Sequence, residues 1–253
     1  MKNELKIFLT ALSFYTRVPV GNIKGWSERM LNKSTRYFPF IGILVGGVGA
    51  LVFTVFNLYL PVSMAVILSM VSTILFTGAF HEDGFADFCD GFGGGYTPEK
   101  ILLIMKDSRI GTYGSIGLIS ILGAKFITLM HTDAMRIPII LIAGHAFSRV
   151  FPVLLIYTSE YARLDASSKT KPVGKADSLF SLLFAVLIGS APLIFFGWHE
   201  IIIVVALLMS TSFFFRNYIT RKLGGYTGDV LGALQQLCEV GFYLAILACE
   251  NCL

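Results

Sequence analysis

Residues Tyr37–Leu60 read YFPFIGILVGGVGALVFTVFNLYL, and residues Val62–Phe80 read VSMAVILSMVSTILFTGAF. No Asp, Glu, Lys or Arg lies between Arg36 and Glu82. Each stretch is long enough to cross a hydrocarbon layer about 30 Å thick as an α-helix. Together they predict two membrane-spanning helices joined by a short turn at Pro61.

The composition of the whole chain agrees with a membrane protein. Of its 253 residues, 55% are hydrophobic and only 14% are charged, which are too few charges to solvate a globule of this size. Disordered, coiled-coil and disulfide-stapled secreted classes are therefore excluded. The net charge of +4 is too small to argue for nucleic acid as a partner. The four cysteines do not make two CxxC pairs, so we expect free thiols rather than a zinc site.

We predict an all-α, polytopic transmembrane helical bundle of about seven spans, forming a single integral membrane domain over residues 1–253. The predicted spans are Tyr37–Leu60, Val62–Phe80, Ile110–Met130, Ile137–Tyr157, Ser178–Trp198, Ile201–Phe215 and Val230–Ala248.

An apolar segment with two cations precedes the first span. Leu5–Val20 contains Lys6 and Arg17, which is typical of an amphipathic helix that lies at the membrane interface or re-enters it. A signal peptide is disfavoured because no small-residue cleavage site follows. The next residues, Gly21–Arg36, are expected to form a charged loop.

The cations fall on one side of this predicted topology. All 20 Lys and Arg residues except Lys125, Arg136 and Arg149 precede the first span or lie in the loops after spans two, four and six. Cytoplasmic loops accumulate Lys and Arg. We therefore predict a multi-pass protein of the cell (inner) membrane, with residues 1–36 and the acidic loop 81–109 in the cytoplasm.

Small residues recur within two of the spans. Gly42 and Gly46 form a GxxxG pair in the first span, and Gly111, Gly114 and Gly117 recur every third residue in the third span. Close packing of helices explains both patterns. No internal repeat indicates the duplicated architecture of a secondary transporter.

Acidic residues are concentrated in HEDGFADFCDGFGGG, His81–Gly95. If the second helix continues into this run, Asp83, Asp87 and Asp90 lie on one stripe with Glu82 beside them. Such a stripe is stable when cations neutralise it, and hard oxygen ligands select Mg²⁺, Mn²⁺ or Ca²⁺. Because Mg²⁺ keeps positions free for phosphate oxygens, we expect a diphosphate-bearing substrate. A solvated acidic loop is the alternative; helical spacing at a membrane boundary favours the metal site.

Two basic segments accompany the acidic run. In MKDSRIGTYG, Met105–Gly114, the cations Lys106 and Arg109 suit phosphate oxygens, and Asp107 suits an added ligand or a salt bridge. A positive-inside flank explains the two cations equally well. Ser168–Lys175 is expected to contact anionic lipid headgroups, with a nucleotide as the alternative.

Several polar side chains lie inside predicted spans. His145 and Arg149 are spaced i, i+4 in the fourth span, and Lys125 lies in the third. Such groups face the bundle interior or snorkel to the interface. Arg149 has the stronger functional claim as a central guanidinium, whereas Lys125 is expected only to find a partner.

The last span carries an acid deep within it. Glu239 shares one broad helical face with Asp229 and Gln236. Because an acid in a span is costly, Glu239 indicates a metal, a cationic partner or a role in proton transfer. We assign His145, Arg149, Asp229 and Gln236 to substrate binding.

Taken together, these motifs resemble the cobalamin synthase family, the adenosylcobinamide-GDP ribazoletransferases. The likeness rests on HEDGFADFCDGFGGG followed by MKDSRIGTYG. It extends to FLTALSFYTRVPV at Phe8–Val20, YFPFIGILVGG at the first span, HAFSR at His145–Arg149, and GYTGD with the later Glu239. The resemblance therefore covers nearly the whole chain.

The resemblance implies a magnesium-dependent phosphotransferase of the last step of nucleotide-loop assembly. The 5′ oxygen of α-ribazole, or of its 5′-phosphate, would attack the cobinamide-linked phosphorus of adenosylcobinamide-GDP, giving adenosylcobalamin or its 5′-phosphate and GMP. Carried over by position, the metal and diphosphate ligands would be Glu82, Asp83, Asp87 and Asp90, supported by Lys106, Asp107 and Arg109, with Asp229 and Glu239 as further candidates. The expected partners are these substrates and the lipid bilayer. A homo-oligomer is possible, and the sequence does not give the oligomeric state.

Two rival functions remain. A CDP-alcohol phosphotransferase of phospholipid synthesis shares the opening DxxDG, which Asp87, Asp90 and Gly91 fit, but the rest of that signature is absent. A cation transporter would use Glu239, Asp229 and Arg149 as a relay. Most carboxylates, however, gather at one interface rather than along a path through the bilayer.

Overall fold

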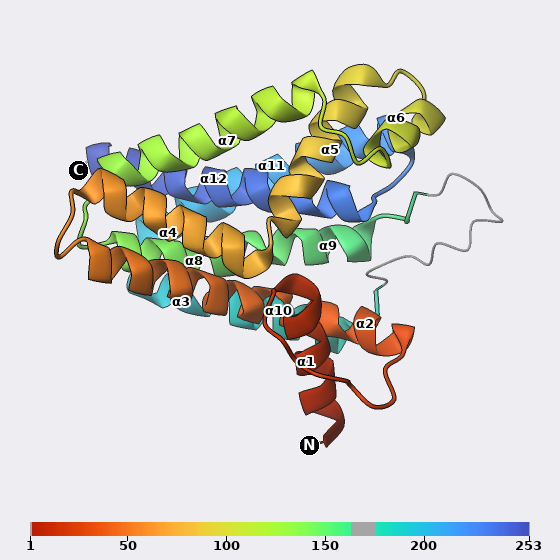
Figure 1. The fold of residues 1–253 in the computed structure, drawn as a ribbon, viewed down its shortest axis with the longest axis horizontal. Coiled ribbons are helices and arrows are strands. Elements are labelled where there is room, and N and C mark those ends of the chain that lie inside the picture. The colour runs from red at the N-terminus through yellow and green to blue at the C-terminus, as the bar shows by residue number, and fades with distance from the viewer. Residues whose placement is uncertain (1, 163–175, 253) are drawn as a thin grey trace.

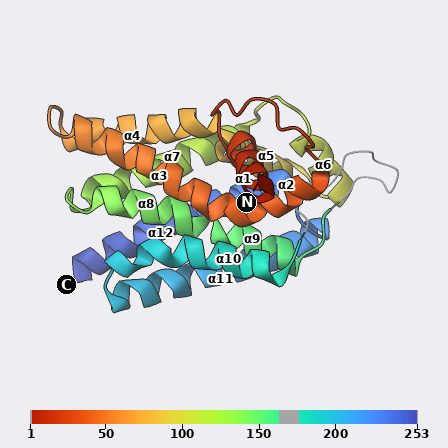
Figure 2. The ribbon, with the colours of Figure 1, turned by 90° about the horizontal axis from the view of Figure 1, so that it is seen from below.

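The computed structural model describes residues 2–162 and 176–252, and within these ranges the chain forms helices and no strand (Figure 1). The helices are α1 (Lys2–Tyr15), α2 (Glu28–Ser34), η1 (Thr35–Tyr37), α3 (Phe38–Phe56), α4 (Val62–Thr77), α5 (Phe80–Gly94), α6 (Pro98–Met105), α7 (Thr112–His131), α8 (Ile137–Ser148), α9 (Val150–Thr158), α10 (Leu179–Ser190), η2 (Ala191–Phe195), α11 (Trp198–Leu223) and α12 (Gly228–Cys252). The predicted all-α bundle is thereby confirmed. Most helices follow the long axis, and α1 lies across them (Figures 1 and 2).

The predicted number of about seven membrane crossings is not confirmed. Among the described residues, five helices are long and apolar enough to span a membrane, or up to six if α4 and α5 count as one broken span. The segment Leu179–Phe195 is apolar but shorter. Seven spans are therefore not confirmed.

Two boundaries predicted from hydropathy are wrong. Ile201–Phe215 is only the apolar part of α11, a helix of 26 residues that continues through Arg216 to Leu223. The expected loop Gly21–Arg36 contains the short helix α2, which begins at the cap Ser27 and runs through η1 into α3. In both places the prediction treats the charged residues as the end of a helix. Long charged side chains near a helix end can reach water while the backbone stays helical, so the helix continues past them.

The predicted acidic loop 81–109 is largely helical, because α5 covers the acidic run and α6 follows it. α5 does not continue α4 in a straight line, since the two helices meet at 88°. The turn is made by Gly78 and Ala79, whose φ angles are +69° and +58°. A Cβ on Gly78 would overlap with the Arg17 side chain, so the close approach and the positive φ both favour glycine at this position. As a result α5 lies across the end of the bundle (Figure 1).

The GxxxG pair in α3 packs against α8, as predicted. A Cβ on Gly42 would overlap with the His145 carbonyl, and one on Gly46 would lie 2.6 Å from Ile142 Cα. The absence of side chains therefore allows the two backbones to touch.

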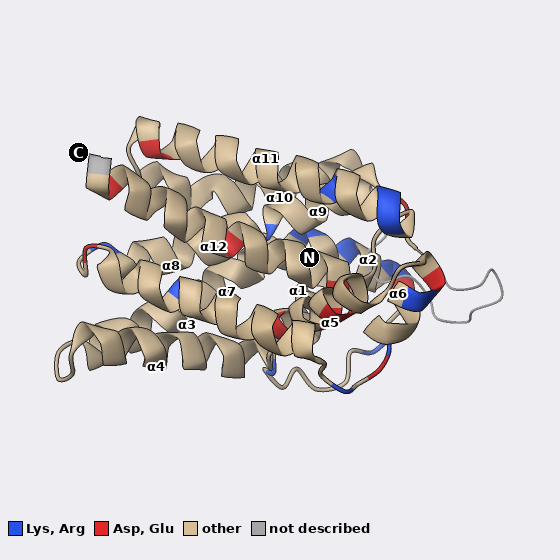
Figure 3. Cartoon of the chain, turned by 90° about the horizontal axis from the view of Figure 1, so that it is seen from above, with Lys and Arg blue, Asp and Glu red and all other residues tan. Residues whose placement is uncertain are grey.

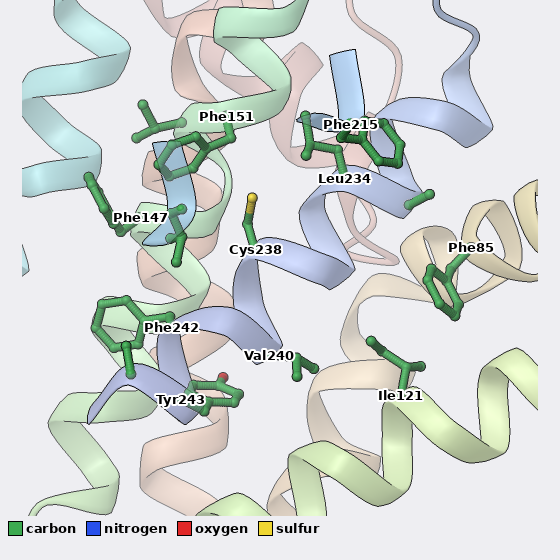
Figure 4. Close-up of a cluster of buried hydrophobic side chains, with 14 of the residues drawn as sticks. Phe85, Ile121, Phe147, Phe151, Phe215, Leu234, Cys238, Val240, Phe242 and Tyr243 are labelled. Carbon is green, nitrogen blue, oxygen red and sulfur yellow. The ribbon is translucent and has the colours of Figure 1, made fainter. Parts of the chain in front are cut away.

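The hydrophobic core surrounds α12. Figure 4 shows Cys238, Val240 and Phe242 leaving α12 in different directions, toward α8 and α9 on one side and α5 and α7 on the other. Cys89 and Cys238 are free thiols, as expected. With α12 enclosed by other helices, its polar side chains must find partners inside the protein.

Charged residues are distributed unevenly along the bundle. Most Lys, Arg, Asp and Glu residues gather at the end where α2, α5 and α6 lie (Figure 3). The opposite end holds the α3–α4 turn, the α7–α8 turn and the C-terminus (Figure 2). The loops predicted to share one side of the membrane therefore lie at one end of the molecule, apart from Ser168–Lys175, which lies outside the described residues.

Candidate active site

The acidic helix α5 meets the first turn of α12. A Cβ on Gly84 would lie 3.0 Å from Asp229 Cα, so this glycine lets the two backbones cross. Asp83, Asp87 and Asp90 keep the predicted stripe because α5 is helical throughout. Asp229, far away in sequence, is thereby brought beside the stripe.

Asp90 has a task that its spacing did not reveal. Its carboxylate accepts hydrogen bonds from the backbone N–H groups of Gly111 and Gly114, at 2.7 Å and 2.8 Å. These are free N–H groups of the first turn of α7, and a carboxylate there also meets the positive end of the helix dipole. A Cβ on either glycine would overlap with the carboxylate. Two of the three glycines ascribed to helix packing therefore also seat Asp90.

The remaining acids of the stripe are open to a ligand. Neither the Asp83 nor the Asp87 carboxylate has a hydrogen bond or ion pair to another described residue, and Asp83 is exposed. Burial, with the charges of Asp229, Asp83 and Asp90, raises the pKa of the Asp87 carboxyl to about 7. Like-charged carboxylates held this close are stabilised by a cation.

The donor set fits a hard divalent ion held by few protein ligands. Within the described ranges no three His, Cys, Asp or Glu side chains form a ready-made metal cage. Mg²⁺ commonly binds through one or two carboxylates, with water and substrate phosphate completing its shell. Asp83 and Asp87 supply such a pair, and Asp229 lies beside them.

The segment after α6 is held near α5 by Asp90. Because Gly111 donates to Asp90, the preceding residues Lys106 to Arg109 lie beside the C-terminal half of α5. The Arg109 guanidinium donates two hydrogen bonds to the Asp107 carboxylate, at 2.6 Å and 3.0 Å, and the Arg109 backbone N–H donates a third at 3.1 Å. The Arg109 side chain stays 86% exposed. The same bonds lower the pKa of Asp107 to about 2. Asp107 therefore holds Arg109, which is the salt-bridge alternative predicted for it.

Glu239 lies in a buried network with a cationic partner. Its Oε1 is 2.7 Å from Lys125 Nζ, and its Oε2 is 3.1 Å from His145 Nδ1. Gln235 and Tyr243 each donate a further hydrogen bond to it. Of the three roles considered for Glu239, the cationic partner is the one present. With four groups around its oxygens, we do not retain Glu239 among the metal ligands proposed below.

A chain of amides links this network to the acidic helix. Gln235 donates to Glu239 at 2.6 Å, and Gln236 Nε2 lies 3.0 Å from Gln235 Oε1. Gln236 also donates to Glu82 Oε1 at 3.1 Å. Glu82 thus faces the bundle interior, away from Asp83. Its second oxygen, Oε2, is buried without a hydrogen-bond partner among the described residues.

Arg149 is buried at the junction of α8 and α9. Its Nη1 donates to the His145 carbonyl at 2.7 Å, and its guanidinium lies 5.3 Å from the centre of the Phe38 ring. The side chain is only 1% exposed. Arg149 and His145 therefore belong to the same interior network as Glu239, separate from the open carboxylates.

Sequence reasoning missed several members of this arrangement. Tyr243 and Ser148 join the network by hydrogen bonds to Glu239 and Gln235. Gln235, which helical spacing already places near Glu239, links Glu239 to Gln236. The available signal was the spacing of Gln235, Glu239 and Tyr243, each four residues after the last, which places them on one face of α12.

The fold and the site define a class: a polytopic α-helical membrane protein with a carboxylate-bearing helix across one end and a buried ion-paired network inside. A model of the family described as cobalamin-5-phosphate synthase matches residues 7–247. The chain belongs to the cobalamin-5-phosphate synthase family.

Similar proteins carry one name. The adenosylcobinamide-GDP ribazoletransferase of Shewanella amazonensis is 42% identical over 250 residues, covering 97% of this chain and 96% of that protein. The proteins of that name from Vibrio cholerae and Vibrio parahaemolyticus are 40% and 38% identical, over 98% of this chain and 95% and 94% of their own lengths. No solved structure matches the chain.

Proposed function

We propose that this protein is an adenosylcobinamide-GDP ribazoletransferase. A free ribose hydroxyl of α-ribazole forms a bond to the phosphorus that carries the cobinamide. This hydroxyl is not the expected 5′ oxygen, because an acceptor phosphorylated at its 5′ position gives a product that keeps this phosphate. The bond from that phosphorus to the bridging oxygen breaks, GMP leaves with that oxygen, and the hydroxyl proton is released. With α-ribazole 5′-phosphate the product is the 5′-phosphate of adenosylcobalamin. The observation that carries this proposal is the full-length similarity to proteins of that name.

We propose Mg²⁺ as the cofactor, held by Asp83 and Asp87 with Asp229 beside them. Bound there, the ion neutralises charge on the diphosphate and on the leaving GMP. Asp90 keeps α5 in place against α7, and the exposed Lys106 and Arg109 are suited to contact phosphate oxygens. These residues contribute by positioning and by electrostatic stabilisation, which dominate phosphoryl-transfer catalysis.

We also propose that the protein lies in the cell (inner) membrane with α5 toward the cytoplasm. The concentration of Lys and Arg at the end that holds α5 supports this orientation. Nucleotide substrates are cytoplasmic, so the carboxylates would meet them from that side.

The experiment is an assay of GMP release by the purified protein in lipid nanodiscs. Adenosylcobinamide-GDP should yield GMP and the corresponding cobalamin only when α-ribazole or its 5′-phosphate and Mg²⁺ are both present. A parallel reaction with CDP-diacylglycerol and an alcohol acceptor tests the phospholipid alternative. Release of CMP there, with no GMP from the corrinoid substrate, would replace this proposal.

A further inference from the structure

A partly enclosed cavity lies where α1, α5, α9 and α12 meet. The space inside it and at its open mouth is about 430 Å³. The residues that matter for its chemistry are Phe14, Tyr15, Phe38, Phe80, His81 and Leu231. The cavity is separate from the open carboxylates and from the Glu239 network.

Aromatic rings dominate one wall of this cavity. The Tyr15 and Phe38 rings are stacked with centres 4.3 Å apart, and the Phe38 and His81 rings are stacked at 5.5 Å and 18°. Phe80 meets both Tyr15 and His81 edge to face. Such a wall favours a flat aromatic ligand, because offset-stacked and edge-to-face contacts suit planar rings.

One polar atom in the wall lacks a partner. His81 is 2% exposed, and its Nε2 has no hydrogen-bond partner among the described residues. Buried polar atoms are normally paired, and one that is not calls for an explanation such as a missing ligand. An imidazole nitrogen bonds either a ring nitrogen or an N–H group. The cavity thus offers aromatic faces and one polar contact to its ligand.

The cavity adjoins the proposed metal site across one helix. On the wheel of α5, Gly84 lies between Asp87 on one side and His81 on the other. The Asp229 backbone crosses at Gly84, and Gly228, its neighbour, borders the cavity. A ligand whose flat end enters the cavity would therefore extend its other end toward Asp229 and Asp87.

We propose that this cavity binds the aromatic base of the acceptor nucleoside, a benzimidazole, with His81 Nε2 as its polar contact. The inference rests on the proposed function, which supplies an acceptor that has a flat heterocycle at one end and a ribose with the reacting hydroxyl at the other. It explains why an apolar, aromatic cavity lies beside a charged site.

The first test removes the polar contact and keeps the ring. His81→Phe preserves the stack on Phe38 but has no ring nitrogen. We expect the Kd of labelled α-ribazole, measured by equilibrium dialysis without corrinoid, to rise about tenfold, as for a lost buried hydrogen bond. The KM for adenosylcobinamide-GDP should stay within about twofold. His199→Phe is the matched control, since His199 Nε2 is also buried without a partner but does not border the cavity.

The second test fills the cavity. Leu231→Trp places a large side chain in it, and Leu187→Trp makes the same change at a site that is 70% exposed on α10. Gly232→Ala is a gentler variant, because its Cβ would lie 3.4 Å from the nearest atom, the His81 carbonyl oxygen. We expect Leu231→Trp to abolish ribazole binding, Gly232→Ala to weaken it severalfold, and Leu187→Trp to leave it unchanged.

The outcomes separate the two proposals. Ribazole binding that depends on His81 and Gly232 supports the cavity even if no GMP is released, in which case the proposed function alone fails. An unchanged Kd in both His81→Phe and Gly232→Ala overturns the cavity proposal, whatever the activity. Loss of a co-purifying phospholipid from Leu231→Trp in native mass spectrometry, with ribazole binding intact, would assign the cavity to an acyl chain and also overturn it.

Discussion

At the scale of single residues, two aspartates three positions apart have different surroundings. The Asp90 carboxylate accepts hydrogen bonds from two backbone N–H groups, whereas the Asp87 carboxylate has no hydrogen bond or ion pair to a described residue. A carboxylate that caps a helix contributes to stability, and one held open among like charges is available to a ligand. Sequence spacing made these two aspartates equivalent, and the tertiary structure separates them.

Substitution should therefore affect the two aspartates differently. We expect Asp87→Asn to reduce turnover at least about a hundredfold, because charge stabilisation by the metal is lost, without lowering the melting temperature of the metal-free protein. Asp90→Asn should lower the melting temperature, since losing a charged cap costs about 1 kcal/mol or more. GMP release and thermal unfolding measure the two effects. Full activity of the Asp87→Asn variant would show that Asp87 is not a ligand of the metal.

The pKa of Asp87, near 7, predicts a pH dependence of metal binding. The folded protein holds this proton up to about pH 7, whereas an unfolded aspartate loses it near its ordinary pKa of 3.8. In the absence of metal, this group therefore makes the folded state less stable as pH rises from about 4 to 7. Mg²⁺ requires the charged form.

The Mg²⁺ concentration for half-maximal activity should accordingly rise as pH falls from 8 to 6. Titrating activity with Mg²⁺ at each pH measures this shift, and Glu99→Gln on the exposed first turn of α6 is the control. A requirement for Mg²⁺ that does not vary with pH would contradict the role assigned to Asp87.

At the scale of helices, the contact between α3 and α8 depends on missing side chains. Gly46→Ala would bring a Cβ to 2.6 Å from the α8 backbone, whereas Gly47, one residue on, has open space. We expect Gly46→Ala to destabilise the protein by about 1–3 kcal/mol, as overpacking does. Gly47→Ala should be neutral or slightly stabilising. Equal melting temperatures for the two variants would contradict this packing.

The ion pair between Lys125 on α7 and Glu239 on α12 predicts a difference in stability between a single and a double variant. Lys125→Met leaves Glu239 buried with its cation removed, which typically costs about 3–5 kcal/mol. The double variant Lys125→Met with Glu239→Gln has no buried charge left from this pair and should recover most of the loss. Thermal unfolding in nanodiscs compares the three proteins. If the double variant is no more stable than the single one, the cost does not arise from the unpaired charge.

The sequence spacing predicted part of the fold and of the candidate site, and the rest depends on contacts between residues far apart in the sequence. The stripe of Asp83 and Asp87 and the need of Glu239 for a partner follow from helical spacing and from the cost of burying charge. The bond from Gly111 to Asp90 joins residues 21 positions apart, and no local pattern encodes it. The 88° turn was hidden for another reason, since the apolar run continues through Gly78 and Ala79.

At the scale of the whole molecule, the orientation predicts which ends react with an impermeant thiol reagent. Tyr59, which is 79% exposed, and Glu99 on α6 lie at opposite ends of the bundle. In intact cells a cysteine replacing Tyr59 should be labelled, and one replacing Glu99 should be labelled only after permeabilisation. The reverse pattern would invert the proposed topology.

The turn between α4 and α5 also involves the start of the chain. The Arg17 backbone N–H donates to the Phe76 carbonyl at 2.8 Å, and the Arg17 side chain fills the space that Gly78 leaves. During synthesis Arg17 leaves the ribosome long before Phe76 exists, so this contact forms only after α3 and α4 have been made. α1 can therefore pack on α2 and α3 before α4 exists, whereas the contact of Arg17 with the α4–α5 turn, and with it the final orientation of the acidic helix, is completed later in synthesis.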